Sequence, residues 1–323
     1  MKLSIIIPVY NTAQFLDRCI ESIYKDNPLN TADFEVICVN DGSTDKSQEK
    51  LDQYAAKYSN FTALVQFNQG QSAARNRAME IASGDYLYFL DSDDTLNAAA
   101  LFKALINGIH HDAGLITIDH IKVDEKGNVC NRQDKNVYKD LPELISGAEL
   151  LYDYSVRGSI WSYIYYRSLI EDRHISFTEG VYHEDEEFII KYICSDPMVY
   201  NSRQLVYYYT QREGSTVNPT TDLKKKKLLN DLLYVGCSIS DMIMPDQAEI
   251  MQKGLSRKVS QIAIGFLIRL LRTDLEKKEK EALLWKFISS SLYPIKTTNL
   301  KLSHKLFSLT ANTVISVIYE RNI

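Results

Sequence analysis

Hydrophobic residues gather in four short runs over the first hundred positions of the chain, and a group of polar residues follows each run. With those polar residues included, the segments are 5–11, 36–43, 63–70 and 86–94. The runs are continuous and rich in β-branched side chains, which is typical of strands buried on both faces of a parallel sheet. The pattern therefore predicts four such strands.

Apolar residues recur at helical spacing between these runs. After Asn11, which we expect to be an N-cap, the spacing predicts a helix with one apolar stripe against the sheet. The stripe is formed by Phe15, Leu16, Cys19, Ile20, Ile23 and Tyr24. Residues 71–81 predict a crossover helix, and another is expected to begin near Asn97. The alternation of strands and helices predicts a doubly wound α/β structure with a mostly parallel sheet.

The polar groups at the four strand ends predict one shared pocket, because ligands bind outside the carboxyl ends of the strands in an open α/β sheet. The sharpest of these groups is Asp91-Ser92-Asp93-Asp94. Carboxylates two residues apart can hold a hard divalent cation, which in turn binds phosphate oxygens. The alternative is an acidic turn that caps the helix near Asn97. That alternative leaves the crowding of three carboxylates unexplained, because they repel one another without a cation.

Two further strand ends carry groups suited to a nucleotide. Asp41, followed by Gly42, can accept hydrogen bonds from a base or a ribose, although a plain strand-to-helix turn uses the same residue types. In the segment 68–76, Gly70 allows close approach and the guanidinium of Arg75 reaches toward an anion. The positive charge of Arg75 near a helix start is unfavourable for the helix dipole, and this mismatch hints at function.

Length, cysteine content and charge describe the chain as a whole. Its 323 residues predict a main domain and a smaller appended unit. The five scattered cysteines have no spacing suited to zinc or a disulfide framework, which favours a reducing compartment. The first apolar run is short and interrupted by Pro8, so we expect no signal peptide. No segment reaches the roughly 20 apolar residues that cross a bilayer, and we expect a cytoplasmic protein.

Charge changes sign near residue 220. Residues 220–323 hold 17 Lys and Arg against 10 Asp and Glu, a net of +7, so the total of −5 leaves −12 for residues 1–219. We therefore predict a main domain over 1–219 and a basic helical region over 220–323. The acidic main domain, and the lack of aromatic residues among the lysines, argue against a nucleic-acid partner.

The basic region has two open interpretations. It contains four consecutive lysines at 224–227, an apolar stripe over 262–271 with basic neighbours, and an apolar helix over 302–319 that begins beside Lys301, His304 and Lys305. The basic neighbours of the stripe are Arg257, Lys258, Arg269 and Arg272. Cationic apolar helices can bind an anionic membrane surface. The same pattern is typical of a small helical bundle with solvated charges.

The motifs together resemble glycosyltransferase family 2. The resemblance covers roughly residues 1–215 and comes in the expected order. It is carried by 4–11, 39–45, 70–76, 89–94 and 183–185. It implies a GT-A fold, with a nucleotide-sugar half over about 1–110 and an acceptor half over about 111–219, that binds a nucleotide-diphosphate sugar, most often a UDP-sugar. It also implies transfer with inversion to a hydroxyl acceptor, which together with the basic tail suggests a bacterial surface polysaccharide or a lipid-linked glycan.

The resemblance assigns roles to residues of this chain. Pro8 and Tyr10 would border the base, and Asp41 would hydrogen-bond uracil. Asp91 and Asp93 would form the DxD pair, with Asp93 nearer to a Mg²⁺ or Mn²⁺ ion. The remaining candidates for contact with the nucleotide sugar are Asn68, Gly70, Arg75, Ser92, Arg212 and Ser215.

The catalytic base would be Asp185, with Glu184 as its neighbour, in the segment 182–188. From the residues alone, acids at a helix start are usually dipole complements, which is our interpretation of Glu186 and Glu187. The Gln-x-x-Arg-Trp motif of processive family members is absent around Trp161 and Trp285, so the resemblance implies a single-addition enzyme.

Departures from the family pattern and competing functions also follow from the sequence. Asn40 stands where many members have an aspartate, but neighbours on a strand point to opposite faces, so Asp41 can still reach a ligand. Trp161 resembles a segment that shapes the acceptor side. The segment 91–95 also matches the Asp-x-Asp-x-Thr motif of haloacid-dehalogenase-like phosphatases, in which the first Asp is a nucleophile. A non-catalytic nucleotide-sugar binder is the other alternative. A sugar nucleotidyltransferase is disfavoured, because no glycine-rich basic loop follows the first run.

Overall fold

The computed structural model describes residues 2–28, 30–131, 138–211, 221–297 and 300–320, and it divides into two compact units. The first unit comprises residues 1–147, 157–180 and 195–215. The second comprises 148–156, 181–194 and 216–323. The predicted division at residue 220 falls where 212–220 lie outside the described residues, so it stays a prediction. The two units are described separately below.

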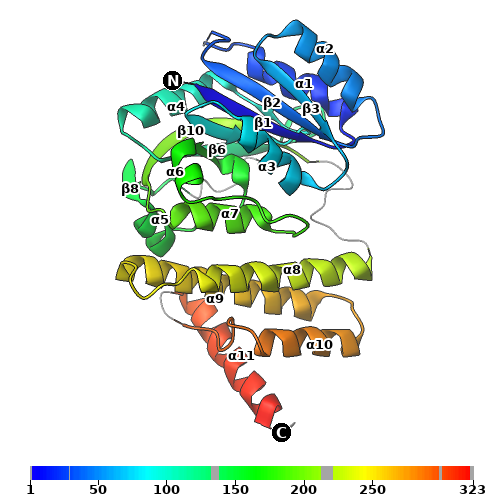
Figure 1. Ribbon diagram of the computed structural model, residues 1–323. Helices are drawn as coiled ribbons and strands as arrows, with labels where there is room; N and C mark the ends of the chain where they lie inside the picture. Colours follow the sequence, from blue (N-terminus) through cyan, green and yellow to red (C-terminus); the bar gives the residue numbers. More distant parts are fainter. Residues whose placement is uncertain (1, 29, 132–137, 212–220, 298–299, 321–323) are drawn as a thin grey trace. The chain divides into compact units, whose positions relative to one another are not determined.

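The first unit is built on a single mixed sheet of ten strands among the described residues (Figure 1). The strands run in the order β3-β2-β1-β4-β9-β6-β10-β5, with β7 beside β6 and β8 beside β10. Their bounds are β1 Leu3–Val9, β2 Phe34–Asp41, β3 Phe61–Gln66, β4 Tyr86–Phe89, β5 Thr95–Leu96, β6 Leu115–Val123, β7 Val129–Asn131, β8 Leu144–Ser146, β9 Tyr163–Tyr166 and β10 Met198–Thr210. Strands β1 to β4 pair in parallel, which confirms the four predicted strands.

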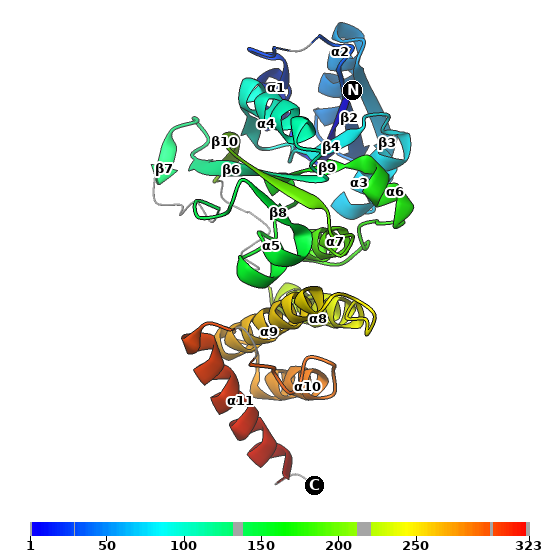
Figure 2. The ribbon, with the colours of Figure 1, turned by 90° about the vertical axis from the view of Figure 1, so that its left-hand side faces the viewer.

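Helices cover both faces of this sheet, as Figure 2 shows. Helices α1 (Ala13–Tyr24), α2 (Ser47–Lys57) and α4 (Ala98–His110) lie on one face, and α3 (Gln71–Ile81) lies on the other. The predicted apolar stripe of α1 is buried against the sheet, with Leu16, Cys19 and Ile20 fully enclosed. Two shorter helices complete the unit, α6 (Arg167–Asp172) and the 3-10 turn Ile160–Ser162. The doubly wound α/β prediction is confirmed.

Two local predictions were wrong. The N-cap position of α1 is Thr12 rather than Asn11, because Asn11 adopts a left-handed conformation (φ 51°) and its side chain bonds the next turn instead. Strand β3 is not buried on both faces. It lies at the edge of the sheet, so Val65 and the following Phe67 are 53% and 89% exposed.

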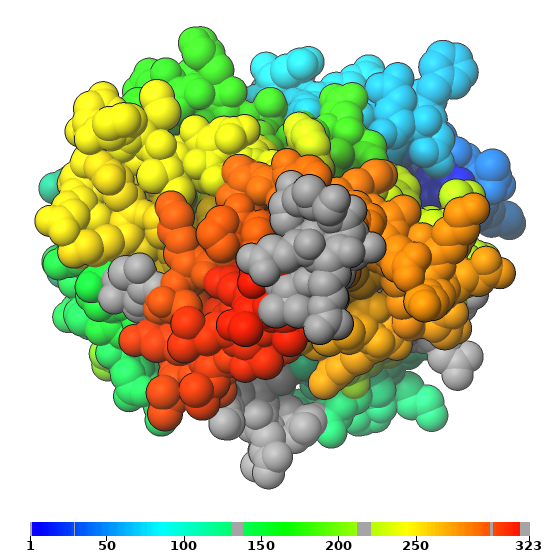
Figure 3. Space-filling view, turned by 90° about the horizontal axis from the view of Figure 1, so that it is seen from below, coloured from blue at the N-terminus to red at the C-terminus, as the bar shows by residue number. Residues whose placement is uncertain are grey.

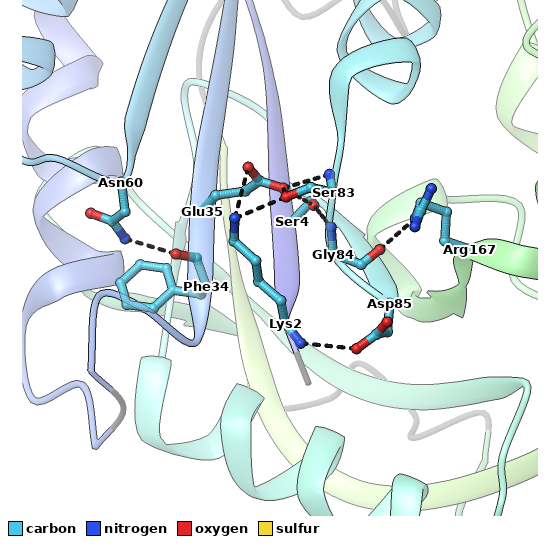
Figure 4. A network of polar contacts seen from close by, with 9 residues as sticks. All are labelled: Lys2, Ser4, Phe34, Glu35, Asn60, Ser83, Gly84, Asp85 and Arg167. Carbon is cyan, nitrogen blue, oxygen red and sulfur yellow. Dashed lines mark hydrogen bonds and ion pairs between the residues drawn. The ribbon is translucent and has the colours of Figure 1, made fainter.

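A polar network links the N-terminal ends of β1, β2 and β4 (Figure 4). The Glu35 carboxylate accepts hydrogen bonds from the Ser4 hydroxyl at 2.6 Å and the Ser83 amide at 2.7 Å, and Lys2 pairs with it at 3.3 Å. The Ser4 hydroxyl in turn accepts from the Gly84 amide at 2.9 Å. A Cβ on Gly84 would lie 2.6 Å from the Ser4 nitrogen, so only glycine fits there. The network fixes the starts of three parallel strands.

The second unit is helical. Its helices are α5 (Gly147–Asp153, from residue 148), α7 (Glu184–Ile193), α8 (Asp222–Asp241), α9 (Glu249–Arg272), α10 (Lys277–Ile288) and α11 (Leu302–Glu320). The apolar stripe predicted over 262–271 is mostly core, since Ile262, Phe266 and Leu270 are at most 5% exposed. Phe266 stacks on Phe287 of α10 with ring centroids 5.4 Å apart. For this stripe the bundle interpretation holds.

Three of the four lysines at 224–227 form ion pairs within the second unit. Lys225 pairs with Asp274 at 2.6 Å, Lys226 with Glu279 at 2.5 Å and Lys227 with Asp231 at 2.7 Å. Helix α11 is different, because three of its leucines are more than half exposed. These are Leu302, Leu306 and Leu309. No helix among the described residues is both long enough and apolar enough to cross a membrane.

Candidate active site

The polar turns after β1 to β4 lie along one edge of the first unit's sheet. Strand β1 lies between β2 and β4. The chain continues from β1 to β2 and β3 on one side, and β4 lies on the other side. This is the topological switch point at which open α/β sheets bind ligands. The turns are tied to one another by side chains. We call the residues that hold them together the strand-end cluster: Asn11, Asp41, Gly70, Arg75, Asp91, Asp93 and Asp94.

Three of these turns contain a residue with a positive φ angle, which reverses the chain sharply. The φ angles are 51° at Asn11, 70° at Gly42 and 90° at Gly70. A Cβ on Gly42 would lie 2.9 Å from the Asn68 nitrogen, so glycine lets the turn after β2 approach the end of β3. Gly70 has open space around it instead, and its requirement for glycine comes from the backbone alone.

Side chains join the turn after β1 to its neighbours on both sides. The Thr44 amide donates to Asn11 Oδ1 at 2.8 Å, and the Asn11 amide donates to Ser43 Oγ at 3.0 Å. Toward β4, the Thr12 hydroxyl donates to Ser92 Oγ at 2.9 Å. Ser92 is only 5% exposed, so its hydroxyl serves to join two turns in this structure.

Asp41 joins β2 to the turn after β3. Its carboxylate accepts hydrogen bonds from the Gln69 amide at 2.8 Å, the Gly70 amide at 2.7 Å and the Gln66 side chain at 2.8 Å. Asn40 faces other partners, as predicted, and its side chain bonds Gln48 and the Ser43 amide. Three of the roughly four lone-pair positions of the Asp41 carboxylate are used within the protein, and the residue is only 3% exposed.

Arg75 joins α3 to the acidic turn after β4. It is 1% exposed, and its guanidinium donates to Asp91 Oδ1 at 2.9 Å. The guanidinium carbon also lies 5.3 Å from the centre of the Phe177 ring, a cation–π distance. The position of Arg75 near the start of α3 predicted an anionic partner. Within the protein, that partner is Asp91. The Asp91 side chain remains 31% exposed.

Asp94 anchors the acidic turn to β10. Its carboxylate accepts from the Tyr207 hydroxyl at 2.5 Å and the Thr210 amide at 2.6 Å. Burial, together with the charges of Asp91 and Asp93, raises the pKa of Asp94 to about 8. The helix-capping alternative is wrong, because Asn97 caps α4 by accepting from the Ala100 amide at 3.0 Å.

Sequence reasoning missed Arg18, which holds the acidic turn from α1. Its guanidinium donates to the Asp93 carbonyl and the Thr210 hydroxyl, both at 2.8 Å, and to the Glu125 carbonyl at 2.7 Å. Nothing in the local sequence marks Arg18, since an arginine on a surface helix is usually solvated. Its partners lie 75 to 192 residues away along the chain.

The carboxylates of the acidic turn are compatible with a divalent cation. Among the described residues there is no group of three His, Cys, Asp or Glu side chains placed to hold a metal. Mg²⁺ is commonly held by only one or two carboxylates together with substrate phosphates. Asp91 and Asp93 are the predicted pair, and their negative charges add to burial in raising the pKa of Asp94.

The other candidates for nucleotide contact are accessible. Tyr10 is 49% exposed, Pro8 is partly exposed and Asn68 is exposed, so each can contact a ligand. Arg212 and Ser215 lie outside the described residues. Trp161 is 7% exposed and stacks on Tyr207 with ring centroids 4.1 Å apart, which makes it part of the core beside the acidic turn.

The predicted base belongs to the second unit, in the first turn of α7. His183 precedes the helix in a left-handed conformation with a φ angle of 67°. The side chain of Glu184 is buried at 3% exposure, whereas Asp185 is partly exposed. Of the two predicted catalytic carboxylates, Asp185 is therefore the more accessible.

Basic side chains of α9 contact the residues on both sides of this acidic pair. Lys258 forms an ion pair with Glu186 at 2.5 Å, and Arg269 bonds His183 Nε2 at 3.1 Å. Burial works against the charged form of Glu186, but Lys258 outweighs it and lowers the pKa of this carboxyl. Burial and the charge of Arg269 lower the pKa of His183. The neutral imidazole is thus favoured, with Nε2 as an acceptor.

Comparison with known proteins identifies relatives of this chain. The model of Glycosyl transferase family 2 matches residues 4–172. EpsH of Bacillus subtilis, which is named as a glycosyltransferase, is 30% identical over 54% of this chain and 49% of its own length. The poly(ribitol-phosphate) beta-N-acetylglucosaminyltransferase TarS of Staphylococcus aureus is 29% identical over 66% of this chain and 36% of its own length. The chain spans less than half the length of these two curated relatives.

Solved structures share the fold. Residues 1–349 of S. aureus TarS in complex with UDP-GlcNAc superpose with a TM-score of 0.71 and 23% identity, over 93% of this chain and 83% of that one. The mannosyltransferase PcManGT from Pyrobaculum calidifontis, in complex with GDP-Man and Mn²⁺, gives a TM-score of 0.55 and 15% identity over 96% and 86%. These likenesses confirm the predicted GT-A fold.

Proposed function

The chain belongs to Glycosyl transferase family 2, since the family model covers more than half of it, and we propose that it is an inverting, single-addition glycosyltransferase. The donor is a nucleotide-diphosphate sugar, and we propose a UDP-sugar because TarS is solved with UDP-GlcNAc. The acceptor is a hydroxyl of a bacterial surface polysaccharide or a lipid-linked glycan. The observation that carries the proposal is the strand-end cluster at the switch point of the sheet, which includes five of the predicted residues: Asp41, Gly70, Arg75, Asp91 and Asp93.

On the donor side, the strand-end cluster would hold the nucleotide and the diphosphate. Tyr10 and Pro8 offer exposed surface for the base, and Asp41 would accept a hydrogen bond from it. Asp91 and Asp93 would hold Mg²⁺ or Mn²⁺. When bound, such an ion offsets the negative charge that develops on a departing diphosphate. Arg75 and Arg18 keep the acidic turn in place for this role.

On the acceptor side, Asp185 would be the general base. An acceptor hydroxyl is a poor nucleophile at neutral pH, so a carboxylate that removes its proton during attack speeds the reaction by about 10²- to 10⁴-fold. The oxygen attacks the anomeric carbon while the bond to the diphosphate breaks, and its proton passes to Asp185. A single displacement of this kind inverts the anomeric centre. Glu184, which is buried beside Asp185, would support this carboxylate rather than act on substrate.

Calorimetric titration of UDP tests the donor site. UDP is titrated into the full chain with Mn²⁺ and again with EDTA, and into Asp93→Ala. We expect binding that needs both the metal and Asp93. The matched control is Asp172→Ala, an exposed acid of α6, which should bind UDP like the unchanged protein. Metal-independent binding would place the cation elsewhere, and absence of UDP, GDP and dTDP binding would contradict the proposed donor class.

We also propose that α11 brings the enzyme to the inner face of the cytoplasmic membrane as a peripheral protein. Leu302, Leu306 and Leu309 recur at helical spacing and are 74%, 58% and 55% exposed. Lys301 and Lys305 are exposed beside them, which suits an anionic lipid surface. Figure 3 looks onto the part of the second unit where α11 (red) lies beside α10 (orange).

Vesicle binding tests the role of α11. The full chain should bind phosphatidylglycerol vesicles, and 0.5 M salt should weaken the binding. The double change Leu306→Ser, Leu309→Ser should lower the affinity at least about tenfold, because each leucine loses its apolar contact with lipid. Leu223→Ser on α8, at a position 78% exposed, is the matched control. If the double variant and Leu223→Ser bind the vesicles equally well, α11 does not bind the membrane in this way.

A further inference from the structure

We propose that helix α9 positions the catalytic base: Lys258 and Arg269 hold the first turn of α7, and thereby set the orientation of the Asp185 carboxylate. This inference rests on the proposed function, because it takes Asp185 as the base. It assigns to the C-terminal helices a part in the reaction. Lys258 and Arg269 are positioning residues here, since they act through α7 rather than on substrate.

The first turn of α7 needs cations to hold it together. It carries four consecutive acids at 184–187, of which Glu184 and Glu187 are 3% and 1% exposed. A helix N-terminus favours acidic residues, but adjacent buried carboxylates repel one another. In addition, His183 precedes the helix in a left-handed conformation, which is unfavourable for a residue other than glycine. Lys191 of α7 itself pairs with Glu187 at 3.1 Å, and further contacts to the turn come from other helices.

Those further contacts come from the C-terminal helices of the same unit. Lys258, with a side chain only 9% exposed, pairs with Glu186 at 2.5 Å, and Arg269 bonds His183 at 3.1 Å. Helix α8 adds the Ser238 hydroxyl, which donates to Glu187 at 2.5 Å. Its Asp231 carboxylate accepts from the Tyr182 amide at 2.9 Å.

The arrangement brackets the acidic pair. His183 directly precedes Glu184-Asp185 and Glu186 directly follows it, and each of these two flanking residues is bonded to α9. Lys258 and Arg269 are eleven residues apart, which is three turns and places them on one face of α9, about 16 Å apart along its axis. Their long side chains therefore converge on one turn of α7. Loss of either contact weakens the hold on one end of the segment that carries Asp185, although the contacts from α8 remain.

The effect on the reaction follows from the demands of proton transfer. A general base must lie within hydrogen-bond reach of the proton it removes, and a displacement of about 1 Å can cost about 10²-fold in rate. UDP binding depends instead on the strand-end cluster, which contains no residue of α7 or α9. Release of α7 should therefore lower kcat and leave UDP affinity unchanged.

The experiment compares Lys258→Met and Arg269→Gln with matched controls on the same helix, Lys253→Met and Arg272→Gln. Lys253 pairs with Glu249 on α9 itself, and Arg272 is exposed. Turnover is followed as release of the nucleoside diphosphate, with water as acceptor: UDP from UDP-N-acetylglucosamine or UDP-glucose, or GDP from GDP-mannose, whichever donor the enzyme hydrolyses. We expect kcat to fall about 10²-fold in Lys258→Met, Arg269→Gln together, with UDP affinity within twofold and the controls unchanged. Lys258→Arg should restore most of kcat.

Two additions separate positioning from simple loss of folding. The pair Lys258→Met, Glu186→Gln removes the contact without leaving an unpaired buried charge, and it should still lower kcat. In an Asp185→Asn background, Lys258→Met should lower the residual rate no further. An equal further fall there would mean a general structural effect and would overturn the inference.

Hydrogen exchange gives a readout that does not depend on any substrate. Amides in the first turn of α7 should exchange faster in Lys258→Met than in Lys253→Met, and equal exchange would overturn the inference. The proposed function fails separately: if Asp185→Asn keeps normal turnover, Asp185 is not the base, whatever Lys258→Met does.

Discussion

The strand-end cluster and the first turn of α7 both present carboxylates, but they are held in place by different means. In the strand-end cluster, backbone amides and short side chains of neighbouring turns bond one another, and Arg18, Arg75 and Tyr207 of the same unit anchor the acidic turn. In α7, two basic side chains of the neighbouring helix α9 contact the turn. The first arrangement follows from the order of the strands, and the second depends on how a helical bundle packs.

This difference has a consequence for how the two parts respond to change. The strand-end cluster should tolerate substitutions in the C-terminal helices, because the contacts described above for it all come from the first unit. The α7 turn should be sensitive to the same substitutions. Donor binding and proton transfer are thereby expected to be separable by mutation, and the following variants test that separation.

The largest effect is expected for Asp185→Asn. Loss of the proton acceptor should lower transfer by roughly 10²- to 10⁴-fold, while UDP affinity stays unchanged because the strand-end cluster is intact. Turnover and calorimetric titration on the same preparation measure both quantities. Asp172→Asn, an exposed acid of α6, serves as the control. Near-normal turnover would remove Asp185 from the role of base, and lost UDP binding would show that the two regions are not independent.

A smaller effect on stability is expected for Asp41→Asn. The carboxylate accepts three hydrogen bonds, and an asparagine would turn an NH₂ group toward at least one of these donors. Leaving such a group unsatisfied costs about 1 to 3 kcal/mol. We expect the urea midpoint of the first unit to fall and UDP affinity to fall with it. If the midpoint matches that of Asp172→Asn, the Asp41 bonds do not hold the turn.

The smallest effect is a pH dependence from His183. Burial and Arg269 lower its pKa in the folded state, whereas the unfolded chain takes up the proton near pH 6.5. The stabilising effect of the neutral imidazole is therefore fully present above about pH 6.5 and is lost as the pH falls toward the folded-state pKa. The charged groups facing it are Arg269, Glu184, Glu186 and Asp231.

We expect urea midpoints between pH 5 and pH 7.5 to change less in His183→Asn than in the unchanged protein. Asparagine tolerates the left-handed conformation and does not titrate. His304→Asn on α11, a partly exposed histidine, is the control. An unaltered pH profile in His183→Asn would mean that this histidine does not contribute.

Much of the first unit could be predicted from the sequence because its signals are local. Continuous apolar runs predicted β1 to β4, and helical spacing predicted α1 and α3. The polar residues at the strand ends then predicted a shared pocket from the direction of parallel strands alone. The apolar run of β3 was misjudged because a buried and an edge strand can have the same composition, and only the strand order decides between them.

The contacts that could not be predicted from the sequence join residues that are far apart along the chain. Asp94 meets Tyr207 across 113 positions and Arg18 meets Thr210 across 192, and no local pattern encodes such a pairing. The basic residues beside the stripe at 262–271 were ambiguous for a related reason. Lys258 and Arg269 could be solvated, bind lipid or pair within the bundle, and the packing of α7 against the C-terminal helices settles this in favour of pairing.

The network of Ser4, Glu35 and Gly84 lies at the beginning of the strands whose other ends carry the strand-end cluster. Gly84 and Asp91 can lie roughly 20 Å apart along the chain. The strand register that is fixed at Gly84 nevertheless determines the position of Asp91. A slip of one residue would reverse the direction of every side chain on β4. Screens of random variants should therefore recover inactive enzymes altered at Gly84 or Ser4, far from any substrate, that mimic the loss of the acidic turn. Only a structural probe of the register would distinguish the two.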